Sequence, residues 1–137
     1  MRRILRVRDV MATKLECIGP EASIMDCARR LVSRNISGLL VVDSAGDLVG
    51  IITERDLIKV ALSAGYHDES GGLVRDYMST ELVTVDAGES VMDVAERSTR
   101  SSHRRFPALD GGRLVGLIAR RDVLRALTSG AWFPAPT

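Results

Sequence analysis

A hydroxyl and a carboxylate stand three residues apart where a predicted strand gives way to a predicted helix. The apolar run 48–52 is short and rich in β-branched residues, which indicates a strand. From Arg55 onward the apolar residues recur at helical spacing. Thr53 and Asp56 therefore stand beside the free backbone N–H groups of a helix start, which suits a polar ligand. The same residue types also cap ordinary helices, so the motif alone leaves both interpretations open.

A dense basic cluster, His103-Arg104-Arg105, stands directly before a second predicted strand, 106–109. A guanidinium group binds phosphate through two parallel hydrogen bonds, so these residue types suit a phosphorylated ligand. A solvated run of charge that includes Arg100 explains the cluster equally well.

The elements that carry these groups occur twice in the chain. The matching pieces are residues 7–11 (Val-Arg-Asp-Val-Met) with 74–78 (Val-Arg-Asp-Tyr-Met), 23–26 with 90–93, Gly50 with Gly116, Ile52 with Ile118, and Asp56 with Asp122. The first two matches are about 67 residues apart and the last three about 66, so one residue is lost in the intervening turn. An internal duplication is the strongest signal in this sequence.

Each copy predicts the element order β-α-β-β-α after a short helical lead-in. In the first copy we expect strands over 14–18, 39–42 and 48–52, with helices from Ser23 and from Arg55 to about Ala64. In the second we expect strands over 82–85, 106–109 and 114–119, with helices over 90–100 and 121–128. Residues 43–47 and 110–112 have the composition of hairpin turns.

This ordered set, repeated twice, resembles a tandem pair of cystathionine β-synthase (CBS) domains, often called a Bateman module. The resemblance covers roughly residues 7–128 and implies an α/β (α+β) fold with two repeats related by a pseudo-two-fold axis. Its boundaries are repeat 1 over 7–65, a linker over 66–73, repeat 2 over 74–129 and a tail over 130–137. A repeat of about 60 residues buries too little apolar surface to be stable alone, so we expect the two repeats to pack together.

The resemblance implies a ligand-sensing module that binds AMP, ADP, ATP or S-adenosylmethionine in a cleft between the repeats. In CBS pairs the residue matching Asp56 bonds the ribose hydroxyls, and the residue matching Thr53 helps hold the nucleoside. A carboxylate can accept from both vicinal hydroxyls at once. The other residues implied for this site are Ile51 and Ile52 of the preceding strand, Val83, Thr84 and Ala87 for the adenine, and Arg104, Arg105, Ser37 and Arg34 for the phosphates.

A second, weaker site is implied around Asp122, with Cys17, Ile18 and Ala22 lining the adenine pocket. Ala119 stands where the first repeat has Thr53 and has no hydroxyl to offer. Arg120 and Arg121 flank Asp122, and we expect them to compete with a ribose for its carboxylate.

Composition excludes several classes of function. A net charge of +1 provides no general field for nucleic acid or an anionic membrane, and no apolar run is long enough to span a bilayer. We therefore predict a cytoplasmic protein. Cys17 and Cys27 are too few for a disulfide framework, and His67 and His103 lack the spacing of metal ligands. Motifs of catalysis or of phosphate-cradling loops are absent, so we predict neither an enzyme, nor a metal site, nor a required cofactor.

The output of such a sensor must pass through an unknown protein partner or through oligomerisation. We expect a homodimer joined by outer helical faces, with the apolar residues Leu57, Val60, Ala61, Val123, Leu124 and Leu127 free to pair. We also expect Trp132 and Phe133 of the tail to pack, across a subunit interface for example. The alternative functions are a structural dimeric scaffold with vestigial sites and, less favoured, a nucleic-acid binder that uses Arg100 and residues 103–105.

Overall fold

The computed structural model describes residues 4–67 and 72–129 in two compact units. Unit 1 combines residues 1–15 with residues 83–137, and unit 2 consists of residues 16–82. Each unit therefore holds one β-α-β-β-α set together with the lead-in of the other set. The linker residues 68–71 and the tail, with the predicted packing of Trp132 and Phe133, lie outside the described residues.

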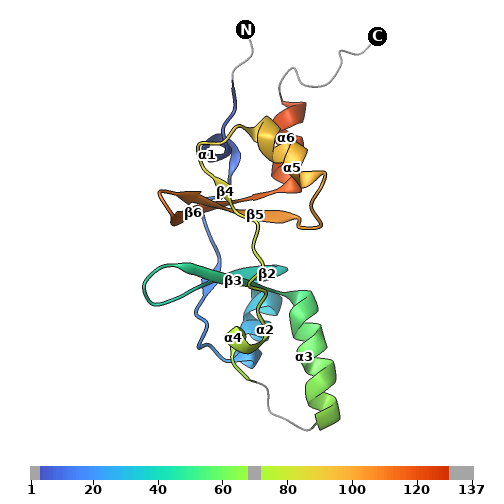
Figure 1. Cartoon of the computed structure of the whole chain (residues 1–137). Coiled ribbons are helices and arrows are strands. Elements are labelled where there is room, and N and C mark those ends of the chain that lie inside the picture. Colours follow the sequence, from blue (N-terminus) through green and yellow to red (C-terminus); the bar gives the residue numbers. More distant parts are fainter. Residues whose placement is uncertain (1–3, 68–71, 130–137) are drawn as a thin grey trace, which may run out of the picture. The chain divides into compact units, whose positions relative to one another are not determined.

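Unit 2 is a three-stranded sheet with its helices on one face (Figure 1). Its elements are β1 (Cys17–Ile18), α2 (Ile24–Arg34), β2 (Gly38–Val42), β3 (Leu48–Thr53), α3 (Glu54–His67) and the lead-in helix α4 (Val74–Tyr77). The strand order is β1-β2-β3, with β1 parallel and β3 antiparallel to β2. Its core includes Ile24, Cys27, Leu31, Ile52 and Val74.

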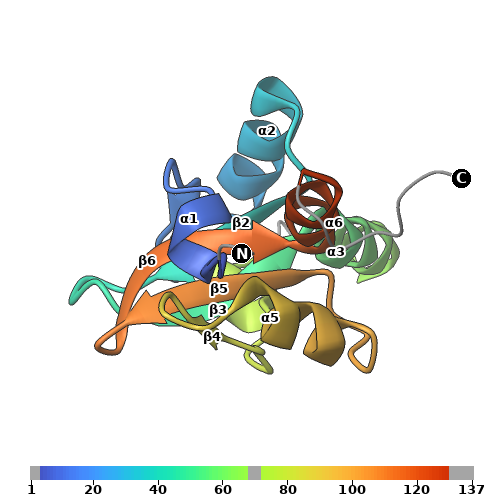
Figure 2. The ribbon, with the colours of Figure 1, turned by 90° about the horizontal axis from the view of Figure 1, so that it is seen from above.

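Unit 1 repeats this arrangement with the other half of the chain. Its elements are the lead-in helix α1 (Val7–Val10), β4 (Val85–Asp86), α5 (Val91–Ser98), β5 (Arg105–Asp110), β6 (Arg113–Ala119) and α6 (Arg120–Thr128). The strand order is β4-β5-β6, again with one parallel and one antiparallel pair. In Figure 2, α1 lies over β6 and α5 lies on the side of β4 and β5. The core includes Val7, Val91, Val94, Phe106 and Ile118.

Local sequence explains where the first helix of each unit begins and which face it buries. Ser23 caps α2 by accepting a hydrogen bond from the Asp26 backbone N–H at 3.1 Å, and Ser90 caps α5 in the same way with Asp93. The buried positions of α2 fall at Ile24, Cys27 and Leu31, the spacing of one helical stripe.

The predicted order of elements is confirmed, but the first strands are shorter than predicted. Only Cys17–Ile18 pairs with β2, whereas residues 14–18 were expected, and Val85–Asp86 replaces the expected 82–85. Residues further upstream form bridges of their own, outside these strands. Ala12 bridges Leu117 of unit 1, and Ser79 bridges Ile51 of unit 2.

The predicted outer apolar face needs correction. Leu57, Val60 and Val123 are buried in the cores, so they are not free to pair with a second copy. Ala61 and Leu124 are exposed, as predicted, and other exposed apolar side chains on the helices include Ile58 and Leu62 on α3 and Val32 on α2. The helix phase decides this, because Leu57 faces the sheet and Ile58, one residue on, is turned about 100° away.

Candidate functional site

The β3–α3 junction joins Thr53 and Asp56 in a reciprocal cap. Oδ2 of Asp56 accepts from the Thr53 backbone N–H at 2.9 Å and from the Thr53 hydroxyl at 3.0 Å. The Asp56 N–H points back to Oγ1 of Thr53 at 3.4 Å. Both residues are half-buried. Among the residues that the structure describes, Oδ1 of Asp56 has no hydrogen-bond or ion-pair partner. This oxygen is available to an incoming hydroxyl.

Strand pairing brings Ser37 to the same junction. Gly38 pairs with Thr53 across β2 and β3, and the Glu54 N–H donates to the Ser37 carbonyl at 2.9 Å. Ser37 is half-buried, so a small hydroxyl group stands beside the helix start that carries Asp56. The predicted association of Ser37 with the Thr53–Asp56 motif is thus present within unit 2.

Arg34, the second residue of unit 2 predicted to contact phosphate, forms an ion pair with Glu16. Both side chains remain about half exposed, at 50% and 40%. An exposed ion pair of this kind is worth little, so a phosphate could draw Arg34 away at a small cost. In this structure the charge of Arg34 is balanced by Glu16.

The β6–α6 junction of unit 1 has the same backbone but different side chains. Oδ2 of Asp122 accepts from the Ala119 N–H at 2.8 Å, and Ala119 provides no side-chain cap. Oδ1 of Asp122 pairs with Arg125 at 3.2 Å. Both oxygens of this carboxylate therefore have partners, whereas at Asp56 the bonds to Thr53 use Oδ2 alone.

We expected Arg120 and Arg121 to compete with a ribose for the Asp122 carboxylate, but a different arginine forms an ion pair with it. Arg120 donates to the carbonyl of Ser98 at 3.2 Å and to that of Ser101, so its side chain is turned toward the end of α5. Arg125, one helical turn after Asp122, is the residue that pairs with it, because positions i and i+3 lie on one face of a helix.

The basic cluster lies beside this second junction. The Arg120 N–H donates to the Arg104 carbonyl at 3.0 Å, and Arg105 pairs with Ala119 across β5 and β6. Arg104 is exposed and Arg105 is half-buried. Within unit 1 the cluster therefore shares a corner with the start of α6.

The predicted adenine-lining residues divide between half-buried and core positions. Val83 and Thr84 of unit 1 are half-buried, as are Cys17 and Ala22 of unit 2. Ala87, Ile18 and Ile52 are buried, and the last two belong to the core of unit 2. Ile51 is half-buried and, as the neighbour of Ile52 in a strand, faces the opposite side of the sheet.

Burial also makes the two thiols poor nucleophiles. Desolvation raises the pKa of Cys17 above its usual value, with Arg30 opposing the effect and Glu16 adding to it. Desolvation likewise raises the pKa of Cys27, again opposed by Arg30. A thiol with a raised pKa stays protonated near neutral pH, which agrees with a packing role.

The eleven residues predicted for the stronger site thus belong to both units. Arg34, Ser37, Ile51, Ile52, Thr53 and Asp56 lie in unit 2, whereas Val83, Thr84, Ala87, Arg104 and Arg105 lie in unit 1. Unit 2 brings Ser37, Thr53 and Asp56 together. That the two sets line one cleft stays a prediction.

Sequence reasoning missed a shallow groove of about 400 Å³ on the helical side of Asp56. The groove is lined by Asp56, Lys59, Val60, Ser63, Asp76 and Tyr77, and so runs between α3 and the lead-in helix α4. The helical spacing of Asp56, Lys59 and Ser63 was visible in the sequence, but the partnership with α4 was not.

Residues 4–67 and 72–129 hold no cluster of three or more His, Cys, Asp or Glu side chains able to bind a metal ion. None of the helices described is both long and apolar enough to cross a bilayer.

Known proteins share this arrangement. The CBS domain family model matches residues 7–63 and 74–129. The uncharacterized protein MJ1225 of Methanocaldococcus jannaschii is 30% identical over 123 residues, which are 90% of this chain but 43% of MJ1225, so the chain spans less than half of that relative. A crystal structure of CBSX2, a CBS-pair protein of Arabidopsis thaliana, in complex with AMP matches with a TM-score of 0.79 at 28% identity, covering 91% of this chain and 97% of that one. The CBS domain pair of protein MJ0100 in complex with 5′-methylthioadenosine and S-adenosyl-L-methionine matches with a TM-score of 0.76 at 29% identity, covering 93% and 98%.

Proposed function

The chain belongs to the CBS domain family, and from that premise we propose that it is a non-catalytic sensor of an adenosine-containing small molecule. The observation that carries the proposal is the β3–α3 junction. There, Oδ2 of Asp56 closes the helix cap while Oδ1 is left to accept hydrogen bonds from a ribose. A nearby hydroxyl on Ser37 and the exposed arginine Arg104 supply polar groups for the rest of a nucleotide.

The ligands of the similar structures support this class of ligand. CBSX2 was crystallised with AMP, and MJ0100 with 5′-methylthioadenosine and S-adenosyl-L-methionine. These three compounds share an adenosine moiety and differ at the 5′ position. The shared part is the one that a carboxylate acceptor at Asp56 would recognise through its vicinal hydroxyls.

We propose that binding is read out by an unknown protein partner or by a change in oligomer state, with a homodimer as the resting form. The exposed apolar side chains Val32, Ile58, Leu62 and Leu124 support an assembly through the helical faces. The same residues favour the second candidate, a dimeric scaffold in which the ligand sites are vestigial.

Isothermal titration separates the two candidates. Purified protein would be titrated with adenosine, AMP, ADP, ATP and S-adenosylmethionine at matched ionic strength, with GMP as a control for the base. The sensor is expected to bind at least one adenosine compound more tightly than GMP. Mass spectrometry of small molecules released from protein purified without added ligand checks that the site was not already filled. Empty protein that binds none of the panel would leave the scaffold as the function.

A further inference from the structure

Helix α5 of unit 1 ends differently from its counterpart α2 of unit 2. Asn35 closes α2 in the left-handed conformation, with φ of 53°, and its N–H donates to the carbonyls of Leu31 and Val32. The residue after α5, Thr99, instead keeps right-handed helical angles, with φ of −70° and ψ of −20°. The end of α5 therefore lacks the left-handed turn that closes α2.

A side chain from α6 completes the end of α5. Arg120, the first residue of α6, donates from its guanidinium to the Ser98 carbonyl at 3.2 Å and to the Ser101 carbonyl. Its backbone N–H donates to the Arg104 carbonyl at 3.0 Å. A positive charge is also favourable at the carbonyl end of a helix. One residue therefore ties both ends of the loop 99–104 to the start of α6.

The residues that Arg120 holds lead directly to the basic cluster. Ser101, whose carbonyl accepts from the guanidinium, also accepts a hydrogen bond at 3.0 Å from the His103 N–H through its hydroxyl. Arg104, whose carbonyl accepts from the Arg120 backbone, is exposed and precedes Arg105, the first residue of β5. Arg120 thus fixes the backbone that carries the cluster.

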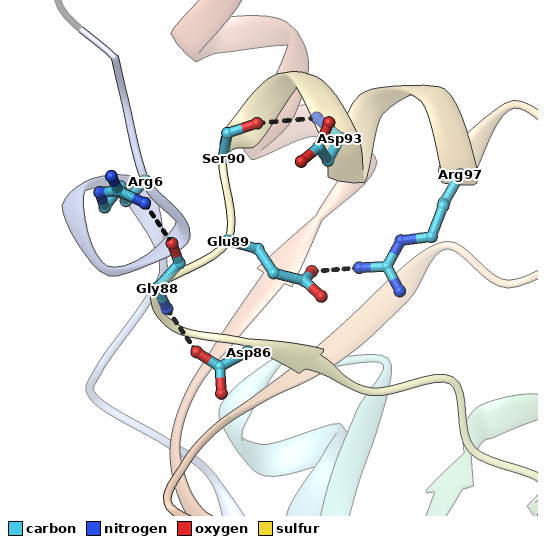
Figure 3. A network of polar contacts seen from close by, with 7 residues as sticks. All are labelled: Arg6, Asp86, Gly88, Glu89, Ser90, Asp93 and Arg97. Carbon is cyan, nitrogen blue, oxygen red and sulfur yellow. Dashed lines mark hydrogen bonds and ion pairs between the residues drawn. The ribbon is translucent and has the colours of Figure 1, made fainter.

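The other end of α5 is fixed without Arg120 (Figure 3). Ser90 caps the first turn by accepting from the Asp93 N–H at 3.1 Å. Glu89, which stands just before this cap, forms an ion pair with Arg97 in the last turn of α5. Loss of the Arg120 side chain should therefore loosen the loop and leave the helix in place.

The bridge from Arg120 crosses an open groove of about 360 Å³ between α5 and α6. The groove is lined by Ala95, Ser98, Thr99, Arg120, Val123, Leu124 and Leu127. Arg120 begins on the α6 side of this groove and reaches Ser98 on the α5 side. Its hydrogen bonds therefore span a gap that side-chain packing leaves open.

Unit 2 shares the backbone part of this arrangement but has a different side chain. Glu54 is the residue of α3 equivalent to Arg120, and its N–H donates to the Ser37 carbonyl at 2.9 Å. An ionised carboxylate has no hydrogen to donate to a carbonyl, so Glu54 cannot form the same bridge. The arginine bridge therefore belongs to the repeat that carries the basic cluster.

We propose that Arg120 is a positioning residue for the phosphate of the ligand, because it holds the loop 99–104 in the form in which Arg104 and Arg105 meet that phosphate. This inference rests on the proposed function, in which a nucleotide binds. A loop that is already ordered loses less conformational freedom on binding than one that must first be ordered. The guanidinium of Arg120 is itself engaged by two carbonyls, so it acts through the loop.

Paired titrations with AMP and adenosine test this role, because the two ligands differ only in the phosphate. Arg120→Ala should lower the affinity for AMP about fivefold or more, whereas the affinity for adenosine should change by less than about twofold. Arg113→Ala is the control for charge, since it removes an exposed arginine from the opposite end of β6. Its AMP affinity should fall by less than about twofold.

Arg120→Lys separates positioning from charge. Lysine keeps the positive charge, but its ammonium stands one bond short of the position from which the guanidinium reaches the two carbonyls. The AMP affinity of this variant should therefore remain about threefold or more below that of wild type. If Arg120→Ala has no cooperative thermal transition, Arg120→Lys decides alone.

Amide hydrogen exchange measures the loop independently of any ligand. In Arg120→Ala the N–H groups of residues 99–104 should exchange about tenfold faster, while those of β5 keep their wild-type rates. Equal losses of AMP and adenosine affinity would make Arg120 a merely structural residue and overturn the inference, as would full AMP affinity in Arg120→Ala or Arg120→Lys. Wild type that binds adenosine and AMP equally would overturn the inference alone. Wild type that binds neither compound would overturn the proposed function and the inference with it.

Discussion

At the scale of single residues, the two carboxylate oxygens of Asp56 have different partners in the structure and different roles in the proposed function. Oδ2 serves the helix cap through Thr53, which any stable helix start could show. Oδ1 has no such task among the described residues, and the homologous oxygen of Asp122 is taken by Arg125. The two junctions therefore share a backbone arrangement but differ in the hydroxyl of Thr53 and in the partner of the second carboxylate oxygen.

Replacing Asp56 by Ala should lower the affinity for the adenosine ligand at least tenfold. Each hydrogen bond to a charged acceptor is worth about 1.5–3 kcal/mol, and two ribose bonds are lost. The lost cap should also cost about 0.5–1 kcal/mol of stability, which melting without ligand measures separately. Asp122→Ala is the matched control, and its affinity should change by less than about threefold. Unchanged binding by Asp56→Ala would reduce this carboxylate to a cap.

Gly50 should be intolerant of even one added methyl group. A Cβ at this position would lie 2.6 Å from the Met78 sulfur and 3.0 Å from the Ser79 carbonyl oxygen. Gly50→Ala must therefore shift the Met78 side chain and press on the backbone at Ser79, and overpacking of this kind costs about 1–3 kcal/mol. Gly19→Ala is the control, since a Cβ there meets nothing within 4 Å. Chemical denaturation of both variants checks the difference, and equal midpoints would contradict this account of Gly50.

At the scale of elements, the sequence predicted what depends on local periodicity. The β-α-β-β-α order, the serine caps and the hairpin turns follow from spacing within a dozen residues. The placement of each lead-in with the other repeat was not predictable in this way, because it rests on pairings such as Ala12 with Leu117 that join distant parts of the chain. The lengths of the first strands were missed because they depend on pairing with β2 and β5, and alternation along the chain does not show where that pairing begins.

The positions of the candidate site residues were predictable to a similar extent. Thr53, Asp56 and Ser37 are together in unit 2, because a strand, a turn and a helix start fix them locally. The ion pair of Arg34 with Glu16 joins residues 18 positions apart and had no signal in the sequence. The pair of Asp122 with Arg125 did have one, since residues three apart on a helix lie on one face.

The lead-in helix α1 should stabilise the second repeat and not the first. Val7 is fully buried in the core of unit 1, so Val7→Ala removes two buried methyl groups there at a cost of about 2 kcal/mol. Amide hydrogen exchange should therefore accelerate in β5, β6 and α5 before it accelerates in unit 2. Val74→Ala is the mirror control and should loosen β2, β3 and α2 first. Faster exchange confined to residues 16–63 in Val7→Ala would contradict this assignment of α1.

At the scale of the whole molecule, near-neutral net charge conceals a difference between the units. Among the described residues, unit 1 has eleven Lys and Arg against seven Asp and Glu, and unit 2 has six against nine. The basic residues of unit 1 include Arg104 and Arg121. The positive balance of unit 1 would attract a phosphorylated ligand, whereas Asp56, the proposed acceptor for the ribose hydroxyls, belongs to unit 2.

One ligand per chain should therefore bind tightly. The lost hydroxyl at Ala119 alone is worth about 0.5–1.5 kcal/mol, a three- to tenfold difference, and Arg125 must also be displaced from Asp122. Titration should give a tight phase of one equivalent that Thr53→Ala weakens. The variant Ala119→Thr/Arg125→Ala should gain a second tight equivalent. Two equal sites in wild type, or a single site that only Asp122→Ala abolishes, would reverse the assignment.

The protein should be a homodimer that is joined through exposed apolar residues on its outer helices. Each sheet carries helices on one face, and Val32, Ile58, Leu62 and Leu124 remain 83%, 60%, 71% and 54% exposed. Burying such side chains against a second copy removes apolar area from water at about 25 cal/mol per Å². Light scattering at micromolar concentration should give twice the chain mass of 14.9 kDa.

Charged substitutions then identify the contact. Ile58→Asp or Leu124→Asp should shift the mass toward the monomer, because each places a carboxylate in the apolar contact at a cost of several kcal/mol. Arg55→Asp, an exposed change near the start of α3, is the control for added negative charge and should leave the dimer intact. Leu57→Asp would be the wrong probe, since Leu57 is buried and its loss would unfold unit 2. Wild type that runs as a monomer would remove the dimer from the proposed function and leave a protein partner as the only output.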